Sequence, residues 1–147
     1  MRYALLALLF LSACDGGPKG NAGPGYTGGA VENPRQALVG RWTVDADRLA
    51  EVGALDHMPE AQRPRAIEMA RNIMNSMLFE FTEDHYAVTM TGRTYERTYA
   101  VKSTEGQVVT IEAKDGEAAE TLTVEFTPKG LVLRAPGERP LPLKPRG

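Results

Sequence analysis

The sequence predicts a mainly β protein: an antiparallel meander of about seven strands, with one amphipathic helix between the first and second strands. Two observations predict this class. From Phe79 to Arg134, apolar and polar residues alternate in short runs, separated by turn dipeptides such as Asp115-Gly116. Before these runs, residues 60–78 repeat their apolar positions every three or four residues, as a helix does. Strands joined by short connections pair as hairpins, so we expect the sheet to curl into a barrel or half-barrel.

The first strand is expected at residues 40–44, directly after a helical turn at 34–39. Asn33 can cap that turn, and Pro34 suits its first position. The other strands are expected at residues 79–82, 86–91, 94–101, 109–113, 121–126 and 131–134. Alternation within each strand predicts one buried face and one solvated face.

The helix carries an apolar stripe that we expect to be buried. Its members recur at helical spacing and are Ala66, Ile67, Ala70, Ile73, Met74, Met77 and Leu78. Met69 lies on or beside this stripe. Pro64 suits the first turn of the helix. Such a helix can plug one end of a barrel or cover an open face of the sheet.

The N-terminus has the layout of a secretory signal. Arg2 precedes a seven-residue apolar run at 4–10, which is too short to span a bilayer, and Leu11-Ser12-Ala13-Cys14 follows. This tetrapeptide resembles the lipobox of bacterial lipoproteins. The resemblance implies that residues 1–13 are a signal peptide and that Cys14 receives a diacylglyceryl thioether and an N-acyl chain such as palmitate. It places the protein on a bacterial membrane, in the periplasm or on the outer surface.

Two further segments flank the predicted domain at 34–135. Cys14 and the stretch that follows it, residues 14–33, are expected to form a flexible tether, because seven glycines and no apolar periodicity follow the cysteine. Its one large residue, Tyr26, is expected to be solvated. Residues 136–147 hold four of the ten prolines, so we expect an extended tail that does not join the sheet.

Gly40-Arg41-Trp42 opens the first strand of the meander, directly after a helical turn. This resembles the Gly-x-Trp motif of the lipocalin superfamily. The resemblance implies a barrel that Trp42 closes at one end, with Gly40 allowing the tight entry. Lipocalins often place a late-strand arginine over that tryptophan, and Arg134 is the counterpart here. The helix after the first strand departs from the transport lipocalins and is more like the small lipocalin-like domains of bacterial lipoproteins.

Composition and motifs exclude several classes. A net charge of -2 gives no basis for nucleic-acid binding, and a lone cysteine cannot form an internal disulfide. No Gly-x-Ser-x-Gly elbow or other catalytic motif is present, so neither an enzyme nor a cofactor is expected. His57 and His85 lack metal-ligand spacing and suit solvated loops. Thioethers can bind copper(I), but core packing is the preferred interpretation of Met58, Met69, Met74, Met77 and Met90.

The expected function is binding rather than chemistry. A small apolar ligand would be held by aromatic strand residues and the methionine-bearing helix, namely Phe79, Phe81, Tyr86, Tyr95, Tyr99, Phe126, Met74 and Met77. An alternative function, from another functional class, is that of a closed-core module that binds an envelope protein. The handling of a soft metal such as copper is a weaker alternative. The first needs an apolar cavity in the meander. The second needs a filled core and an exposed apolar patch.

Overall fold

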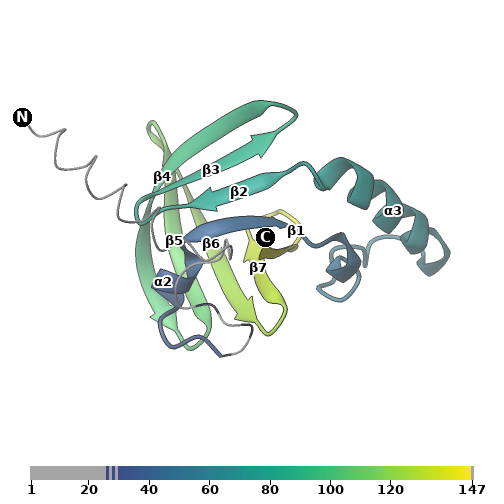
Figure 1. Cartoon of the computed structure of the whole chain (residues 1–147), viewed down its shortest axis with the longest axis horizontal. Coiled ribbons are helices and arrows are strands. Elements are labelled where there is room, and N and C mark those ends of the chain that lie inside the picture. Colours follow the sequence, from purple (N-terminus) through teal and green to yellow (C-terminus); the bar gives the residue numbers. More distant parts are fainter. Residues whose placement is uncertain (1–25, 27, 29, 147) are drawn as a thin grey trace, which may run out of the picture.

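The computed structural model describes Tyr26, Gly28 and residues 30–146. The predicted signal peptide, Cys14 and the start of the tether lie outside the described residues. The described chain forms a closed antiparallel barrel in which each strand pairs with the next and β8 pairs with β1 (Figure 1). The mainly β prediction is confirmed, with eight strands where the alternation predicted about seven. They are β1 (Gly40–Val44), β2 (Leu78–Phe81), β3 (His85–Met90), β4 (Arg93–Glu105), β5 (Val108–Asp115), β6 (Ala118–Thr127), β7 (Gly130–Arg134) and β8 (Leu141–Pro145).

The eighth strand corrects the expected proline-rich tail. Leu141–Pro145 pairs with β7 on one side and β1 on the other. The missing N–H of Pro142 costs little, because that residue lies opposite Asp45, just past the end of β1. The carbonyl of Asp45 instead accepts a hydrogen bond from the backbone N–H of Arg48 at 3.1 Å. Pro145 lies beyond the end of β7, where no ladder partner needs its donor.

The closure between β7 and β8 depends on a very close approach of two backbones. Gly130 has a φ of +145°, and a Cβ atom built on it would lie 2.0 Å from the carbonyl oxygen of Leu143. Only glycine combines this backbone conformation with the absence of a side chain. Gly130 therefore sets the distance at which β8 joins the sheet.

The folded unit also begins earlier than residue 34. The short helix α2 (Pro34–Leu38) is capped by the side chain of Asn33, which accepts a hydrogen bond from the backbone of Gln36. Before it, Val31 is buried, and its backbone N–H and C=O both bond to the side-chain amide of Gln107, at 2.7 and 3.1 Å. The last part of the predicted tether thus belongs to the domain.

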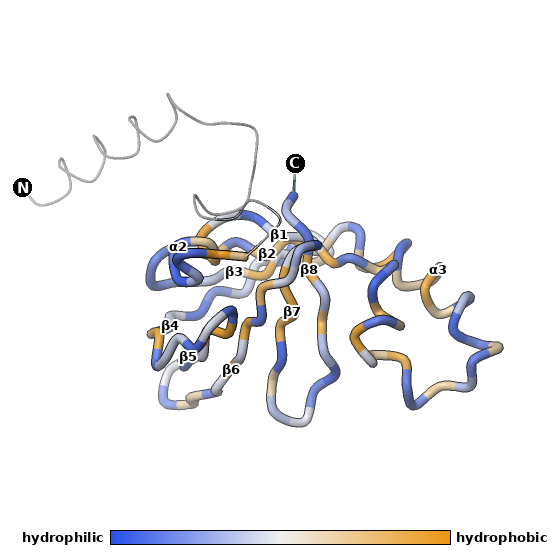
Figure 2. Tube along the Cα trace, turned by 90° about the horizontal axis from the view of Figure 1, so that it is seen from below, coloured by the Kyte–Doolittle hydropathy of each residue, from blue (hydrophilic) through white to orange (hydrophobic). Residues whose placement is uncertain are grey.

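An insertion between β1 and β2 stands beside the barrel (Figures 1 and 2). It contains the 3-10 turns η1 (Ala46–Arg48) and η2 (Glu60–Gln62) and the helix α3 (Arg63–Met74). A small apolar cluster of Ala46, Leu49, Ala54 and Leu55 holds it together, and α3 packs on this cluster through Ala66, Ile67 and Ala70. No helix in the described part of the chain is both long and apolar enough to cross a bilayer.

The position of α3 corrects the expectation that its stripe is buried. The helix packs mainly against η1 and η2 rather than plugging the barrel, and none of its residues is fully buried. Met69 is 55% exposed and Ile73 is 61% exposed. Helical periodicity therefore identified the element, but Met69 and Ile73 remain exposed.

Arg48 joins the insertion to the barrel. Its side chain is almost fully buried, and its Nη2 donates to Oγ1 of Thr127 at 3.0 Å. Nε and Nη1 make no hydrogen bond, and the carboxylate of Glu51 lies 3.9 Å from Nε. Next to it, Glu51 accepts a hydrogen bond from Lys129 at 2.9 Å. The two contacts reach the end of β6 and the turn that follows it, so the base of the insertion is fixed at this corner of the barrel.

Candidate ligand-binding site

One end of the barrel is sealed around Trp42. This side chain is fully buried, and its Nε1 donates to the carbonyl oxygen of Leu38 at 3.0 Å. Its ring lies 5.2 Å from that of Tyr26 and 6.2 Å from that of Phe126. Tyr26, expected to be solvated, instead covers this end. Trp42 thus occupies the place that the Gly-x-Trp resemblance implies, and Gly40 has a φ of +148° that favours glycine.

The same resemblance fails for Arg134. This side chain follows the inward-facing Leu133, so it points to the outer face of the sheet, whereas Trp42 faces inward. Arg134 is exposed, and its guanidinium lies 3.7 Å from the carboxylate of Glu125 on β6. The expected cation–π contact with Trp42 is therefore wrong.

Aromatic side chains fill the middle of the barrel. Phe81 stacks on Tyr86 with ring centroids 5.5 Å apart, and both contact Tyr99, at 6.1 and 6.4 Å. Phe79 and Phe126 are buried in the same core. These five predicted ligand-binding residues pack on one another or on neighbouring core residues, as in the core of a small domain.

The other predicted ligand residues lie toward the open end. Tyr95 is 54% exposed, and it lies opposite Val88 on the inner side of the β3–β4 hairpin. Met74 and Met77 are half-buried and pack against the barrel core where the insertion returns to β2. The structure thus divides the predicted set into a filled interior and a partly exposed mouth.

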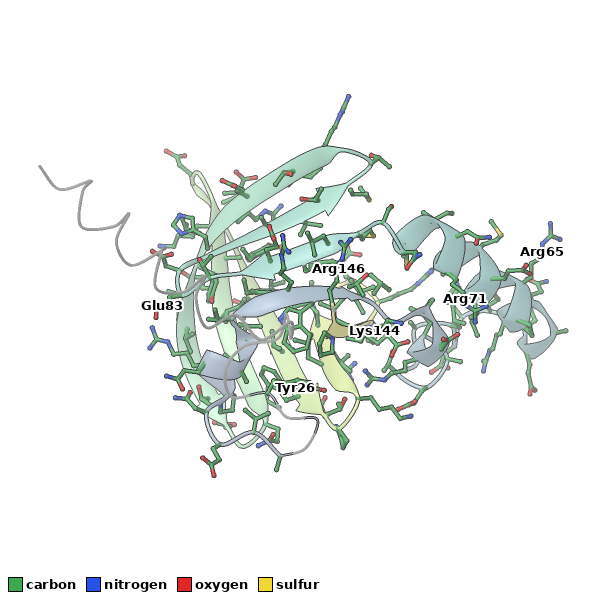
Figure 3. The ribbon with its side chains drawn as sticks, viewed as in Figure 1. Tyr26, Arg65, Arg71, Glu83, Lys144 and Arg146 are labelled. Atoms are coloured by element: carbon green, nitrogen blue, oxygen red, sulfur yellow. The ribbon has the colours of Figure 1, made fainter. Side chains whose placement is uncertain are left out.

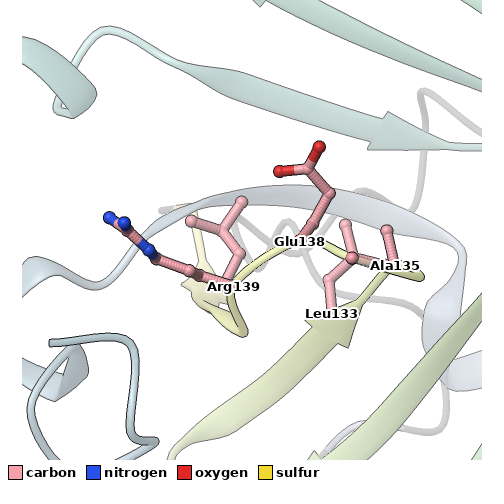
Figure 4. A pocket seen from close by; sticks show the side chains of 6 residues that line it. Leu133, Ala135, Glu138 and Arg139 are labelled. Atoms are coloured by element: carbon pink, nitrogen blue, oxygen red, sulfur yellow. The ribbon is translucent and has the colours of Figure 1, made fainter. Parts of the chain in front are cut away.

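A pocket of about 500 Å³ opens at this mouth, where the chain passes from β7 to β8 (Figure 4). Leu133 and Leu141 are paired residues on the inner face and form its floor, with Ala135 beside them. Gly137, Glu138 and Arg139 form its rim, and the charged groups of Glu138 and Arg139 point in different directions. An apolar floor with a few polar groups at the edge is typical of small-molecule sites, and this volume is in their usual range.

The inner face of the mouth also carries a polar pair. Arg97 donates from Nη1 to Oε2 of Glu120 at 3.1 Å, reaching across β5, where Ala113 leaves room. Burial raises the pKa of Tyr86, which lies directly opposite Arg97, while the guanidinium opposes that rise. The partner of Arg97 is therefore two strands away, on the inside of the barrel.

The described residues form no cluster of side chains that could bind a metal ion. Among the described residues, no three histidine, cysteine, aspartate or glutamate side chains come together. His85 bonds through Nδ1 to Asp84 at 2.6 Å and is exposed, and His57 lies in the exposed loop of the insertion. Met74 and Met77 pack toward the core rather than away from it, as expected if these methionines fill the core.

Sequence reasoning missed the pocket because it missed β8. Alternation predicts Leu133 on the last strand and the prolines predict Leu141 in a tail, so no pattern links the two residues. The signal that could have found the pair is the Leu141-Pro142-Leu143 triplet, whose two leucines keep the period of a strand on either side of a proline.

The chain was compared with protein families, with curated proteins and with solved structures, and none of them matched it. Its function is therefore inferred from its own residues.

Proposed function

We propose that this chain is a bacterial envelope lipoprotein, anchored through lipid on Cys14, whose lipocalin-like barrel binds a small apolar ligand without catalysis. The observation that supports it best is the contrast between the two ends of the barrel. Trp42, Tyr26 and Leu38 seal one end, whereas an apolar pocket of about 500 Å³ opens at the other.

The ligand would lie on Leu133 and Leu141, between the β7–β8 connection and the inner face of the mouth. Tyr95 and Val88 offer further apolar surface on the opposite hairpin, and the filled core below them limits how deep a ligand can enter. A short or flat molecule fits this shape better than a long chain that needs a deep channel.

The ligand test uses a fluorescent apolar probe, 1-aminoanthracene, titrated into the purified full chain in a detergent that does not itself bind the probe. Ala135→Trp would fill the pocket, so we expect probe affinity to fall at least tenfold. Thr121→Trp, on the exposed outer face of β6, should leave affinity unchanged. Equal affinity in both variants would place the probe elsewhere and refute the pocket.

The anchor has a separate test. Cys14→Ala should abolish labelling by radioactive palmitate and block cleavage of the signal peptide. Persistence of both in the variant would show that the lipobox assignment is wrong, whatever the barrel binds.

A second candidate function follows from the exposed part of α3. The barrel core is filled, and Met69 and Ile73 lie on the surface, which is the combination expected of an interaction module. Crosslinking from Ile73 to an envelope protein, lost in Ile73→Ser, would favour this candidate.

A further inference from the structure

One side of α3 carries an exposed stripe in which two apolar residues lie beside a cation. Arg65, Met69, Asn72 and Ile73 follow helical spacing along this stripe, and Glu68 and Arg71 are exposed on its flank. Met69 and Ile73 are the two most exposed large apolar residues of the described chain, at 55% and 61%. Within the described residues Arg65 forms no ion pair, and its side chain extends from the far end of the insertion (Figure 3).

A shallow groove continues this stripe toward the preceding loop. It has a volume of about 440 Å³ and is lined by Met58, Ala61, Gln62, Arg65, Ala66 and Met69. Apolar surface therefore extends from the loop onto the helix. We define the stripe and this groove together as the α3 face.

The chain that leads to Cys14 enters the barrel at the corner from which the insertion leaves. Tyr26 donates its hydroxyl to the carbonyl oxygen of Thr127 at 3.4 Å. Arg48 donates to the side-chain hydroxyl of the same Thr127 at 3.0 Å. The last residue of β6 thus holds both the N-terminal segment and the base of the insertion.

This shared corner fixes how far a lipid on Cys14 can be from α3. Eleven residues separate Cys14 from Tyr26, a stretch that spans at most about 40 Å when fully extended. The helix itself has 12 residues and is about 18 Å long. A lipid held in a bilayer therefore keeps the α3 face within reach of that bilayer, at an effective concentration on the order of millimolar.

We propose that the α3 face lies on the phospholipid bilayer, with Met69 and Ile73 between the headgroups and Arg65 on a lipid phosphate. This proposal rests on the proposed lipid anchor. A stable protein interface needs about 800 Å² on each partner, and a narrow stripe on a helix of three turns suits a shallow membrane contact better. Such a contact is weak alone, but it adds to an anchor that already holds the domain at the surface.

The experiment places an environment-sensitive fluorophore on the α3 face. In the lipidated full chain Cys14 is acylated, so Ile73→Cys supplies the one free thiol for an NBD label. Thr121→Cys, exposed on the outer face of β6, is the matched control. Both proteins are reconstituted into vesicles of phosphatidylcholine and phosphatidylglycerol, with and without nitroxide-labelled lipid.

We expect NBD at position 73 to shift to the blue and to lose at least half of its emission to nitroxide lipid. At position 121 the label should stay accessible to aqueous iodide. Arg65→Glu should reduce the lipid quenching at position 73 at least twofold, because the carboxylate repels the phosphates.

Equal iodide quenching at both positions would overturn the proposal. So would a blue shift at position 73 that rises with protein density but is insensitive to nitroxide lipid, since a second copy would then cover the α3 face. If the protein does not float with vesicles, the anchor is wrong and the face is tested alone. In that case the label at position 73 in a Cys14→Ala background must still shift at millimolar lipid, and no shift refutes the contact.

Discussion

Replacing Gly130 by alanine should break the barrel at the seam between β7 and β8. The residue has a φ of +145°, and a new Cβ would meet the carbonyl oxygen of Leu143 at 2.0 Å and its carbonyl carbon at 3.1 Å. Both atoms belong to the backbone of a neighbouring strand, so no side chain can rotate away to make room.

The cost has two parts. A side chain in this backbone region is strained by about 1–3 kcal/mol. Relief of the clash also requires β7 and β8 to separate by about 1 Å, which weakens ladder hydrogen bonds worth about 1 kcal/mol each. We therefore expect the variant to lose about 3–5 kcal/mol, a large share of the 5–15 kcal/mol typical of a domain.

Urea unfolding followed by the fluorescence of Trp42 measures this loss, because Trp42 is the chain's one tryptophan and is fully buried. Gly116→Ala is the matched control. Gly116 also has a positive φ, of +63°, but nothing lies within 4 Å of its added Cβ. It should cost only about 1 kcal/mol from the backbone conformation.

Equal destabilisation by the two substitutions would refute the reasoning, since it would show that β8 does not approach Gly130 closely. Hydrogen exchange gives a second readout. The amide of Leu143 should lose protection in Gly130→Ala and keep it in Gly116→Ala.

Three more predictions concern pH, a buried charge and the N-terminal segment. Burial raises the pKa of Tyr99 to about 12, from an unfolded value near 10. The resulting stability is complete below pH 10 and is lost as the pH rises toward 12, so urea midpoints should fall in that window, and fall less in Tyr99→Phe. Arg48→Met removes a buried guanidinium that has two nitrogens without a hydrogen bond and a carboxylate, of Glu51, only at 3.9 Å, so thermal unfolding should show little loss or a gain of about 1 kcal/mol. Its exposed counterpart Arg134→Met should change stability by less than about 0.5 kcal/mol; a large loss in Arg48→Met alone would mean that Glu51 and Thr127 compensate the cost of burying the charge. Gln107→Ala removes both bonds to Val31, so hydrogen exchange at that amide should accelerate at least tenfold, and unchanged exchange would contradict the contact.

The strands followed from alternation because each hairpin buries one face. In any antiparallel meander, the side chains of Phe79 and Phe81 lie on the same face of the sheet, as do those of Leu122 and Phe126. The alternation of apolar residues therefore predicts the fold class even when the pairing of the strands is unknown. The eighth strand did not follow, because prolines reduce the expectation of a ladder. Only the register shows that Pro142 lies where β1 has already ended.

Contacts between residues far apart in the sequence could not be predicted from the sequence. Helical spacing identifies α3, but nothing in the spacing says that Met69 and Ile73 remain exposed. Tyr26, which contacts Trp42, belongs to a segment with no periodicity, and the sequence predicts a tether there. The candidate pocket depends on such a contact too, since Leu133 and Leu141 meet only after β8 has closed the barrel.

The seam that closes the barrel joins the first strand to the last. Trp42 lies opposite Pro145. Until β8 has been synthesised, β1 and β7 therefore remain two open edges. Contacts so distant in sequence form slowly, and open edges can pair with other chains in the meantime. A variant that lacks β8 would keep both edges and would be prone to aggregate.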